Sequence, residues 1–430
     1  MSNAISLLHA ALLLTAPAAG LPFEGDTEYR THRFAQTWVG LEYEAVGPGR
    51  LYDPATGGSA PLGARGLGRV GIGALHFWGH ADFYVSFPVL QHSLSGPPEV
   101  PHRFSTGILT GFRAYPWQLT TWGVRPYAGI AWAPSTLRQA VGDGEAGIAQ
   151  VRHRFPLEGG LSLLLPVGLL EAGARYWPAA DLPYAVSRTD EAMLRLPSVS
   201  AWLGWKFVFD TTIGAEEGER SGFNVRRLEN LRKLGLAGRL GVGVGPSFVT
   251  TVSPSSWNTE QRPWLRRSRG ALNLADFTLT AAVPELDGHL SLSYRNGTSE
   301  DVAFGFSQKR SRRSLALEVF RNLANFHGFV PYVGLFGSYE GLAVTETDGG
   351  ATVLARETHR PGFGVLVGWD ILPTQSEFLV LRTNLRYSPT LALPVNDRQS
   401  IAFDQFEFNV IQVVIFPGRL VNHLRTRNES

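Results

Sequence analysis

The chain has 430 residues, of which 48 are glycine, 11% are aromatic, only 18% are charged and none is cysteine. The lack of cysteine excludes disulfides, thiolate metal sites and cysteine nucleophiles. A formal net charge of +2 argues against a general polyanion binder, so we expect no nucleic-acid partner.

The N-terminus carries an apolar run from Ile5 to Leu14 that leads into Ala16-Pro17-Ala18, an A-x-A cleavage pattern. We predict a secretory signal peptide over residues 1–18, although no Lys or Arg precedes the run; a short buried helix is the alternative. Beyond it, no stretch has the 18 continuous apolar residues typical of a membrane helix. An exported chain of this composition is either a soluble periplasmic β-protein or an outer-membrane barrel.

Strand-like runs of residues fill both halves of the chain, eight in each half. In the first half they cover 34–46, 69–78, 81–88, 104–115, 124–133, 153–165, 169–177 and 199–209. In the second half they cover 240–250, 271–283, 289–295, 314–321, 329–344, 358–371, 378–387 and 403–416. We therefore divide the chain into a first repeat (33–209), a charged periplasmic linker (210–238), a second repeat (239–416) and a C-terminal tail (417–430).

The two halves resemble each other in order along the chain. TTWGVRPYAGIAWAPSTLRQA (120–140) matches FHGFVPYVGLFGSYEGLAVTE (326–346), with Pro126 and Pro331 205 positions apart. Further on, Arg175 matches Arg386 at 211 positions, and the run ending at Phe209 matches the run ending at Phe416 at 207. Loop insertions between strands of fixed order would produce this drift, so we predict one ancestral unit present twice.

The connections between the predicted strands alternate in length. Long connections span 47–68, 89–103, 134–152, 178–198, 251–270, 296–313, 345–357 and 388–402, and those between them are short. Long loops at one end and tight turns at the other indicate a barrel that crosses a membrane, with its turns facing the periplasm. Closure is expected because an open sheet edge in hydrocarbon would leave backbone groups unpaired.

Alternation within the strands separates an apolar face from a polar one. In 201–209, Leu203 and Phe207 share one face, and Lys206 lies on the other. The segment 314–321 fits less well, because Glu318 and Arg321 fall on opposite faces. By this parity, thirteen charged residues point inward: Glu42, Glu44, Asp82, Arg125, Glu171, Arg175, Lys206, Asp276, Arg295, Glu340, Arg382, Arg386 and Glu407.

These inward charges nearly balance, with four acids and three bases in the first half and three of each in the second. Because a buried unpaired charge is costly, this balance favours a filled eight-stranded barrel whose interior consists of ion pairs. The lining of a wide aqueous channel is the alternative use of the same residues. Two barrels of eight strands and one barrel of sixteen both remain open; the partner of the strand ending at Phe209 distinguishes them.

The pattern resembles the small outer-membrane barrels of the OmpA, OmpX and opacity-protein type. The residues that carry the likeness are VRPYAG (124–129) and VPYVG (330–334), close to a P-Y-x-G strand of that group, with GLEYEAV (40–46). The resemblance implies an integral protein of the outer membrane in a Gram-negative-type envelope. Such proteins commonly end on an aromatic residue recognised during insertion, which Phe416 and, in the first half, Phe209 resemble; here a tail follows Phe416.

Two basic segments lie in predicted neighbouring outer loops. They contain Arg262, Arg266, Arg267, Arg269, Lys309, Arg310, Arg312 and Arg313. Guanidinium groups bind phosphate bidentately, so we expect these residues to contact lipopolysaccharide phosphates. A solvated basic loop is the alternative interpretation.

Sequence signals for catalysis and for cofactors are weak. His92 and Ser93 lie next to each other, as in a lipid-modifying hydrolase, but no acid partner or further motif accompanies them. No metal-ligand spacing or phosphate-binding loop is present in the sequence. We therefore predict a non-enzymatic, all-β transmembrane antiparallel barrel without a cofactor, with a structural or surface-binding role; a porin-like diffusion pore is the alternative.

Overall fold

The computed structural model describes residues 36–52, 58–93, 102–118, 122–140, 146–178, 181–185, 187–210, 232–251, 254–265, 272–325, 328–372, 377–389, 391–403 and 405–428. The predicted signal peptide and residues 211–231 of the predicted linker lie outside these ranges. Among the described helices, none is both long enough and apolar enough to cross a bilayer.

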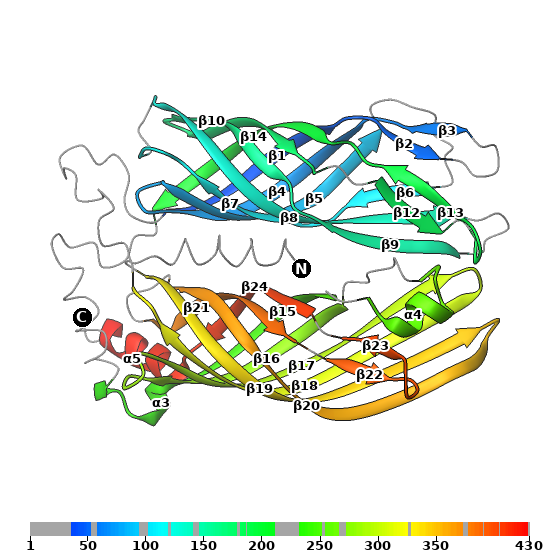
Figure 1. Ribbon diagram of the computed structural model, residues 1–430. Coiled ribbons are helices and arrows are strands. Elements are labelled where there is room, and N and C mark those ends of the chain that lie inside the picture. The colour runs from blue at the N-terminus through cyan, green and yellow to red at the C-terminus, as the bar shows by residue number, and fades with distance from the viewer. Residues whose placement is uncertain are drawn as a thin grey trace. The chain divides into compact units, whose positions relative to one another are not determined.

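Eight antiparallel strands of the first half form a ring, here called barrel 1 (Figure 1). They are β1 (Gln36–Val46), β4 (Arg65–His76), β5 (Ala81–Ser93), β7 (Leu109–Ala114), β8 (Val124–Ala140), β10 (Leu157–Leu165), β11 (Gly168–Tyr176) and β14 (Val199–Asp210). Two pairings complete the ring: Thr37 of β1 with Phe209 of β14, and Leu161 of β10 with Pro126 of β8. The strand ending at Phe209 therefore pairs within its own half.

Short strands occupy the long connections of barrel 1. The strands β2 (Gly49–Tyr52), β3 (Ser59–Leu62), β12 (Asp181–Ala185) and β13 (Glu191–Arg195) form a separate four-stranded sheet. The strands β6 (His102–Thr106) and β9 (Ala146–Arg154) pair with the far part of β8. The predicted strands 104–115 and 153–165 are thus each divided in two.

Eight strands of the second half form a closed ring of their own, here called barrel 2 (Figure 1). They are β15 (Leu240–Thr251), β16 (Leu272–Val283), β17 (Gly288–Ala303), β18 (Phe306–Asn322), β19 (Phe329–Asp348), β20 (Ala351–Ile371), β21 (Leu379–Ser388) and β24 (Gln405–Ile415). At the end with long connections, the loop end, lie α4 (Ser256–Gln261) and the hairpin of β22 (Ala392–Pro394) and β23 (Ser400–Ala402). At the opposite, turn end lie α3 (Leu236–Arg239) and α5 (Pro417–Asn428) (Figure 1).

Two connections predicted as long loops, 296–313 and 345–357, are instead parts of long hairpins. The strands β17 and β18 meet at Phe304 and Gly305, which have φ values of 53° and 71°. The strands β19 and β20 meet at Gly349 and Gly350, with φ values of 56° and 85°. Two successive positive φ values are typical of two-residue hairpin turns. The prediction was wrong because these strand ends carry polar residues on both faces, which hides the alternation of a strand.

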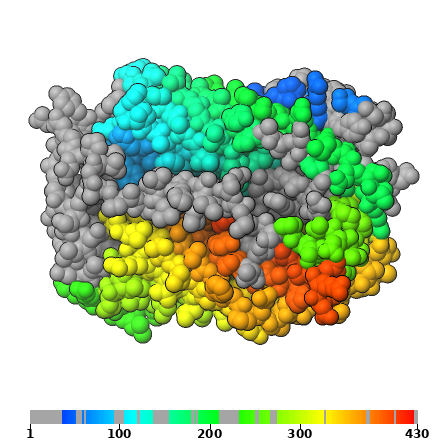
Figure 2. Space-filling view, viewed as in Figure 1, coloured from blue at the N-terminus to red at the C-terminus, as the bar shows by residue number. Residues whose placement is uncertain are grey.

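The outward faces of both barrels carry exposed apolar side chains. In barrel 2 the register places Leu279 beside Leu292, and Leu292 beside Leu317, which are 51%, 44% and 53% exposed. In barrel 1, Leu41 and Leu203 are 61% and 55% exposed. In the space-filling view, the side chains of β19 to β21, coloured yellow to orange, cover this part of the barrel surface without a visible gap (Figure 2). A soluble protein does not keep a contiguous apolar belt in water, whereas a bilayer requires one.

A β-bulge in β24 changes the side-chain parity near the end of barrel 2. Val244 pairs with Val413 and Ser247 with Asn409, so β24 has one residue more than β15 over this interval. The extra residue moves subsequent side chains to the other face. As a result Phe416 is fully buried inside the barrel, whereas Phe209 of barrel 1 is 56% exposed on the lipid side. The expected equivalence of these two aromatic residues is therefore wrong in orientation.

Candidate functional site: the charged barrel interiors

The thirteen charged residues predicted to face inward all lie inside their barrels. Twelve are at most 5% exposed, and the side chain of Glu42 is 11% exposed. Alternation along the strands places most of them there, since the sequence neighbours of residues such as Glu42 and Asp276 face outward on each side. Ring closure then brings residues from distant strands into contact.

Arg113 of β7 is the centre of the network in barrel 1. Its guanidinium lies 2.8 Å from the carboxylate of Glu158 and 2.7 Å from that of Glu171. Two further carboxylates, those of Asp82 and Glu42, lie at 3.9 Å. Arg113 therefore joins acids from β1, β5, β10 and β11 across the lumen.

Three more cations extend this network. Arg175 contacts Glu42 at 2.8 Å and Glu44 at 3.0 Å, and it donates a hydrogen bond to Glu158. The ammonium of Lys206 lies 2.7 Å from both Asp82 and Glu171. Arg69 also contacts Glu44 at 3.2 Å. Five acids and four bases thus meet in one narrow lumen: Glu42, Glu44, Asp82, Glu158 and Glu171 with Arg69, Arg113, Arg175 and Lys206. Arg125 is buried in the same barrel and donates hydrogen bonds to the Ser162 hydroxyl at 3.0 Å and to the Gly79 carbonyl.

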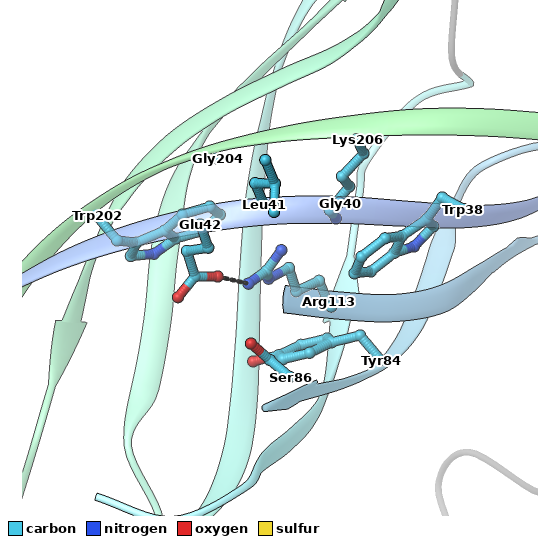
Figure 3. A pocket seen from close by; sticks show the side chains of 11 residues that line it. Trp38, Gly40, Leu41, Glu42, Tyr84, Ser86, Arg113, Trp202, Gly204 and Lys206 are labelled. Atoms are coloured by element: carbon cyan, nitrogen blue, oxygen red, sulfur yellow. Dashed lines mark ion pairs between the residues drawn. The ribbon is translucent and has the colours of Figure 1, made fainter. Parts of the chain in front are cut away.

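Aromatic rings fill most of the remaining space in barrel 1. The guanidinium of Arg113 lies 4.3 Å from the ring centre of Tyr84 and 4.4 Å from that of Trp202. Lys206 lies 4.1 Å from the ring centre of Trp38. These residues and Glu42 line a cavity of about 10 Å³, room for about one water molecule (Figure 3).

Barrel 2 has a network of the same kind around Arg386 of β21. Arg386 contacts Asp276, Glu318 and Glu407, each at 3.0 Å. Glu407 also accepts a contact from Arg295 at 2.9 Å. Other ion pairs lie above and below this centre: Arg312 with Glu340 at 2.8 Å, and Arg382 with Asp370 at 2.8 Å.

Apolar clusters close barrel 2 at both ends. At the turn end, the inner seal consists of Ala282, Val330, Leu372, Val380, Val414 and Phe416. At the loop end, the outer seal consists of Leu342, Val344, Leu391, Leu393, Val395, Ile401 and Phe403, with Trp257 of α4 against it. Below α4, Trp257 donates a hydrogen bond to Glu346 at 2.8 Å, and Asn258 donates one to Gln308 at 3.0 Å.

Nine buried charges of the barrels are not among the predicted inward residues: Arg69, Arg113, Glu158, Asp301, Arg310, Arg312, Glu318, Glu346 and Asp370. Parity would have found Glu158, Glu318 and Asp370, because each stands between residues that face outward. Glu318 is only 3% exposed, whereas Arg321 is exposed on the outer wall, so their opposite faces are correct. Asp301, Arg310, Arg312 and Glu346 were missed because their segments were predicted to be loops.

The predicted lipopolysaccharide contacts do not lie together. Arg310 and Arg312 belong to β18 and point inward, where they pair with Asp301 at 2.7 Å and with Glu340, so the loop interpretation is wrong for them. Arg262 pairs with Glu346 at 3.3 Å. Lys309 and Arg313 are exposed on the outer wall. The remaining three, Arg266, Arg267 and Arg269, lie outside the described residues.

His92 and Ser93 are the last two residues of β5. The ring of His92 lies 3.2 Å from the Tyr43 hydroxyl. Within the described residues, no cluster of three or more His, Cys, Asp or Glu side chains is arranged to hold a metal ion.

No family model and no curated protein matches the chain. Among solved structures, Neisserial surface protein A is similar at 12% identity and a TM-score of 0.30, covering 41% of this chain and 96% of that protein. An outer membrane channel from Pseudomonas putida F1 is similar at 10% identity and a TM-score of 0.19, covering 91% and 98%. The toluene transporter TodX of P. putida is similar at 9% identity and a TM-score of 0.18, covering 89% of each.

The closed sheets and the placement of side chains in this protein identify its class. Sheets closed on themselves leave no unpaired edge, which hydrocarbon does not tolerate. Aliphatic and aromatic side chains are exposed around the outside, and charged side chains are buried inside, the reverse of a soluble protein. The protein is an integral β-barrel protein of the outer-membrane type, with two eight-stranded barrels in one chain.

Proposed function

We propose that both barrels are closed to ions and that the protein has a structural or surface-binding role in the outer membrane. The observation that carries this proposal is the filling of the lumens. In barrel 1, ten charged residues and several aromatic rings occupy the interior. In barrel 2, an ion-pair network lies between the inner and outer seals. An eight-stranded barrel has room for little more than its own side chains.

Conductance in planar lipid bilayers tests this proposal. The reconstituted protein is expected to give no steady current, while a sixteen-stranded porin in the same bilayers serves as the positive control. Stable, stepwise conductance from the purified protein would contradict the proposal and restore the diffusion pore.

The surface-binding role includes, in our proposal, contact with lipopolysaccharide phosphates at the outer wall of barrel 2. The register places Leu315 of β18 between Tyr294 and Tyr339, in an aromatic row at the loop-side edge of the apolar belt. Arg313 lies two residues further toward the loop end, or about 7 Å beyond Leu315. Lys309 follows on the same face. A cation at this height is well placed for a phosphate of the outer leaflet.

A pair of matched variants tests the lipid contact. Lys309→Gln with Arg313→Gln is expected to lower the amount of lipopolysaccharide that co-purifies with the protein. Arg321→Gln is the control, because Arg321 is exposed on the same face of β18 at the turn end. Equal co-purification in all three proteins would contradict the contact.

We also propose that the protein is not an enzyme. The contact of the His92 ring with the Tyr43 hydroxyl at 3.2 Å supports this, because it engages the imidazole that would have to act as the general base. A lipid-modifying activity that is lost in Ser93→Ala would overturn this part of the proposal.

A further inference from the structure

The turn end of barrel 2 carries a helical platform formed by α5, α3 and the two residues Arg232 and Lys233 before α3. Gly418 of α5 packs so closely on α3 that an added Cβ would lie 2.3 Å from the Ala237 carbonyl oxygen. Arg419 donates a hydrogen bond to the Gly238 carbonyl at 2.8 Å. The two helices therefore form one unit.

Arg419 attaches this platform to the barrel. Its guanidinium donates to the carbonyl of Glu377 at 3.1 Å, lies 3.3 Å from the Glu377 carboxylate, and sits 3.8 Å above the ring of Phe416. Arg419 is only 5% exposed, so this face of α5 is turned toward the protein. His423, one turn later, lies on the same side, with its ring 5.5 Å from that of Phe378.

The opposite face of α5 is apolar and uncovered. Val421 and Leu424 are 47% and 51% exposed, and Leu236 of α3 is 73% exposed. Ile415, the last residue of β24, faces the lipid at 38% exposure, so α5 begins two residues beyond the apolar belt. The exposed aliphatic residues thus continue the belt where the hydrocarbon ends and the headgroups begin.

The charge around these aliphatic residues is positive. Arg232, Lys233 and Arg425 are exposed, and Arg239 is partly exposed. The acid that contacts α5, Glu377, is already paired with Arg419. Aliphatic residues flanked by cations are typical of helices that lie in the headgroup layer of an anionic membrane.

We propose that the α3–α5 platform is an interfacial anchor that lies on the anionic phospholipid headgroups of the leaflet at the turn end. It binds through the aliphatic side chains of Leu236, Val421 and Leu424 and through the surrounding cations. The anchor would resist tilting and vertical movement of barrel 2 in the membrane. The anchor is independent of whether the barrels conduct ions.

Site-specific fluorescence tests this anchor, because the natural chain has no cysteine. Leu424→Cys is labelled with the environment-sensitive dye NBD, and the protein is reconstituted in phosphatidylcholine vesicles with or without phosphatidylglycerol. Leu292→Cys, in the belt, is the control for lipid burial. Asn396→Cys, in the exposed turn between β22 and β23, is the control for water.

With phosphatidylglycerol present, the probe at position 424 is expected to be quenched about twofold by a shallow doxyl lipid and to be shielded from aqueous iodide. Charge reversal by Arg232→Glu, Lys233→Glu and Arg425→Glu should reduce this quenching. Iodide access at position 424 equal to that at position 396 would overturn the anchor. Shielding from both quenchers would overturn it too, because protein would then cover this face. The probe at position 292 reports membrane insertion in every case.

Discussion

Barrels 1 and 2 fill the same eight-stranded frame with different side chains. In barrel 1 the cations lie over aromatic rings, as Arg113 does over Tyr84 and Trp202. In barrel 2 a cation also lies over an aromatic ring, Arg382 over Phe320 at 4.6 Å. The space beside its central network in addition holds hydroxyl and amide groups, such as Thr278, which hydrogen-bonds to Gln412 at 2.8 Å. Barrel 2 in addition has an apolar seal at each end.

Arg175 of barrel 1 and Arg386 of barrel 2 can be compared directly. They match in sequence, and both belong to the seventh strand of their ring. Arg175 contacts acids from β1 and β10, whereas Arg386 contacts acids from β16, β18 and β24. The position of a buried cation is thus the same in both barrels, but its partners differ. Neutrality of a closed lumen is required, whereas a particular set of partners is not.

The largest expected effect comes from removing these two arginines. Arg175→Met and Arg386→Met should each lower the free energy of unfolding by about 3–5 kcal/mol, because carboxylates such as Glu158 and Glu407 lose a buried partner. Urea unfolding in detergent, followed by tryptophan fluorescence, measures the loss. Arg321→Met is the exposed control, with an expected change within about 0.5 kcal/mol. An unchanged unfolding midpoint in either interior variant would contradict the ion-pair description of that barrel.

The ends of the two barrels should respond differently to loss of an aromatic ring. Phe416→Ala opens a cavity in the inner seal and should cost about 3–5 kcal/mol of the free energy of unfolding. Phe209→Ala removes a lipid-facing ring without a cavity and should cost about 1 kcal/mol or less. The same urea titration compares them. Equal losses would argue against the change of parity at the bulge in β24.

Removing one tyrosine hydroxyl from each barrel should have a smaller effect. The Tyr84 hydroxyl donates to the Glu158 carboxylate at 2.7 Å, so Tyr84→Phe should cost about 1.5–3 kcal/mol. The Tyr332 hydroxyl donates to the Thr383 carbonyl at 3.3 Å, so Tyr332→Phe should cost about 0.5–1 kcal/mol. Both rings remain in place, so the difference reports the hydrogen bonds alone. The reverse order would contradict the stronger hydrogen bond that we expect for the carboxylate acceptor of Tyr84.

The smallest expected effect is a pH dependence at the turn end of barrel 1. Burial lowers the pKa of His80 below its ordinary value of 6.5, the backbone hydrogen bond to Tyr115 opposes this, and Arg125 adds to the lowering. The folded state therefore binds protons less readily than the unfolded state, and stability is lost as the pH falls below about 6.5. The loss should be small, because His80 is partly exposed. His80→Gln should remove it; an unchanged slope of unfolding midpoint against pH would show that other groups are responsible.

The interior residues found by parity show which features of the lumen can be predicted from the sequence. Glu171 and Lys206 were assigned to the lumen separately, each from its own strand, because alternation is a local property. Their 2.7 Å contact follows only from the pairing of β11 with β14. The basic run 308–313 shows where sequence reading failed: both faces of that strand end are polar, so it was taken for a loop, and Arg310 and Arg312 were placed outside.

The sequence alone determined the all-β class, the sixteen barrel strands, their division into two sets and thirteen of the inward charges. Hydrophobic alternation and turn residues are local patterns, so they can be read without knowledge of the fold. Only the tertiary structure decided that each set closes on itself, through the pairing of β1 with β14 and of β15 with β24. It also decided the bulge that turns Phe416 inward. Closure and register depend on hydrogen bonds between strands far apart in the chain, and no local pattern specifies those partners.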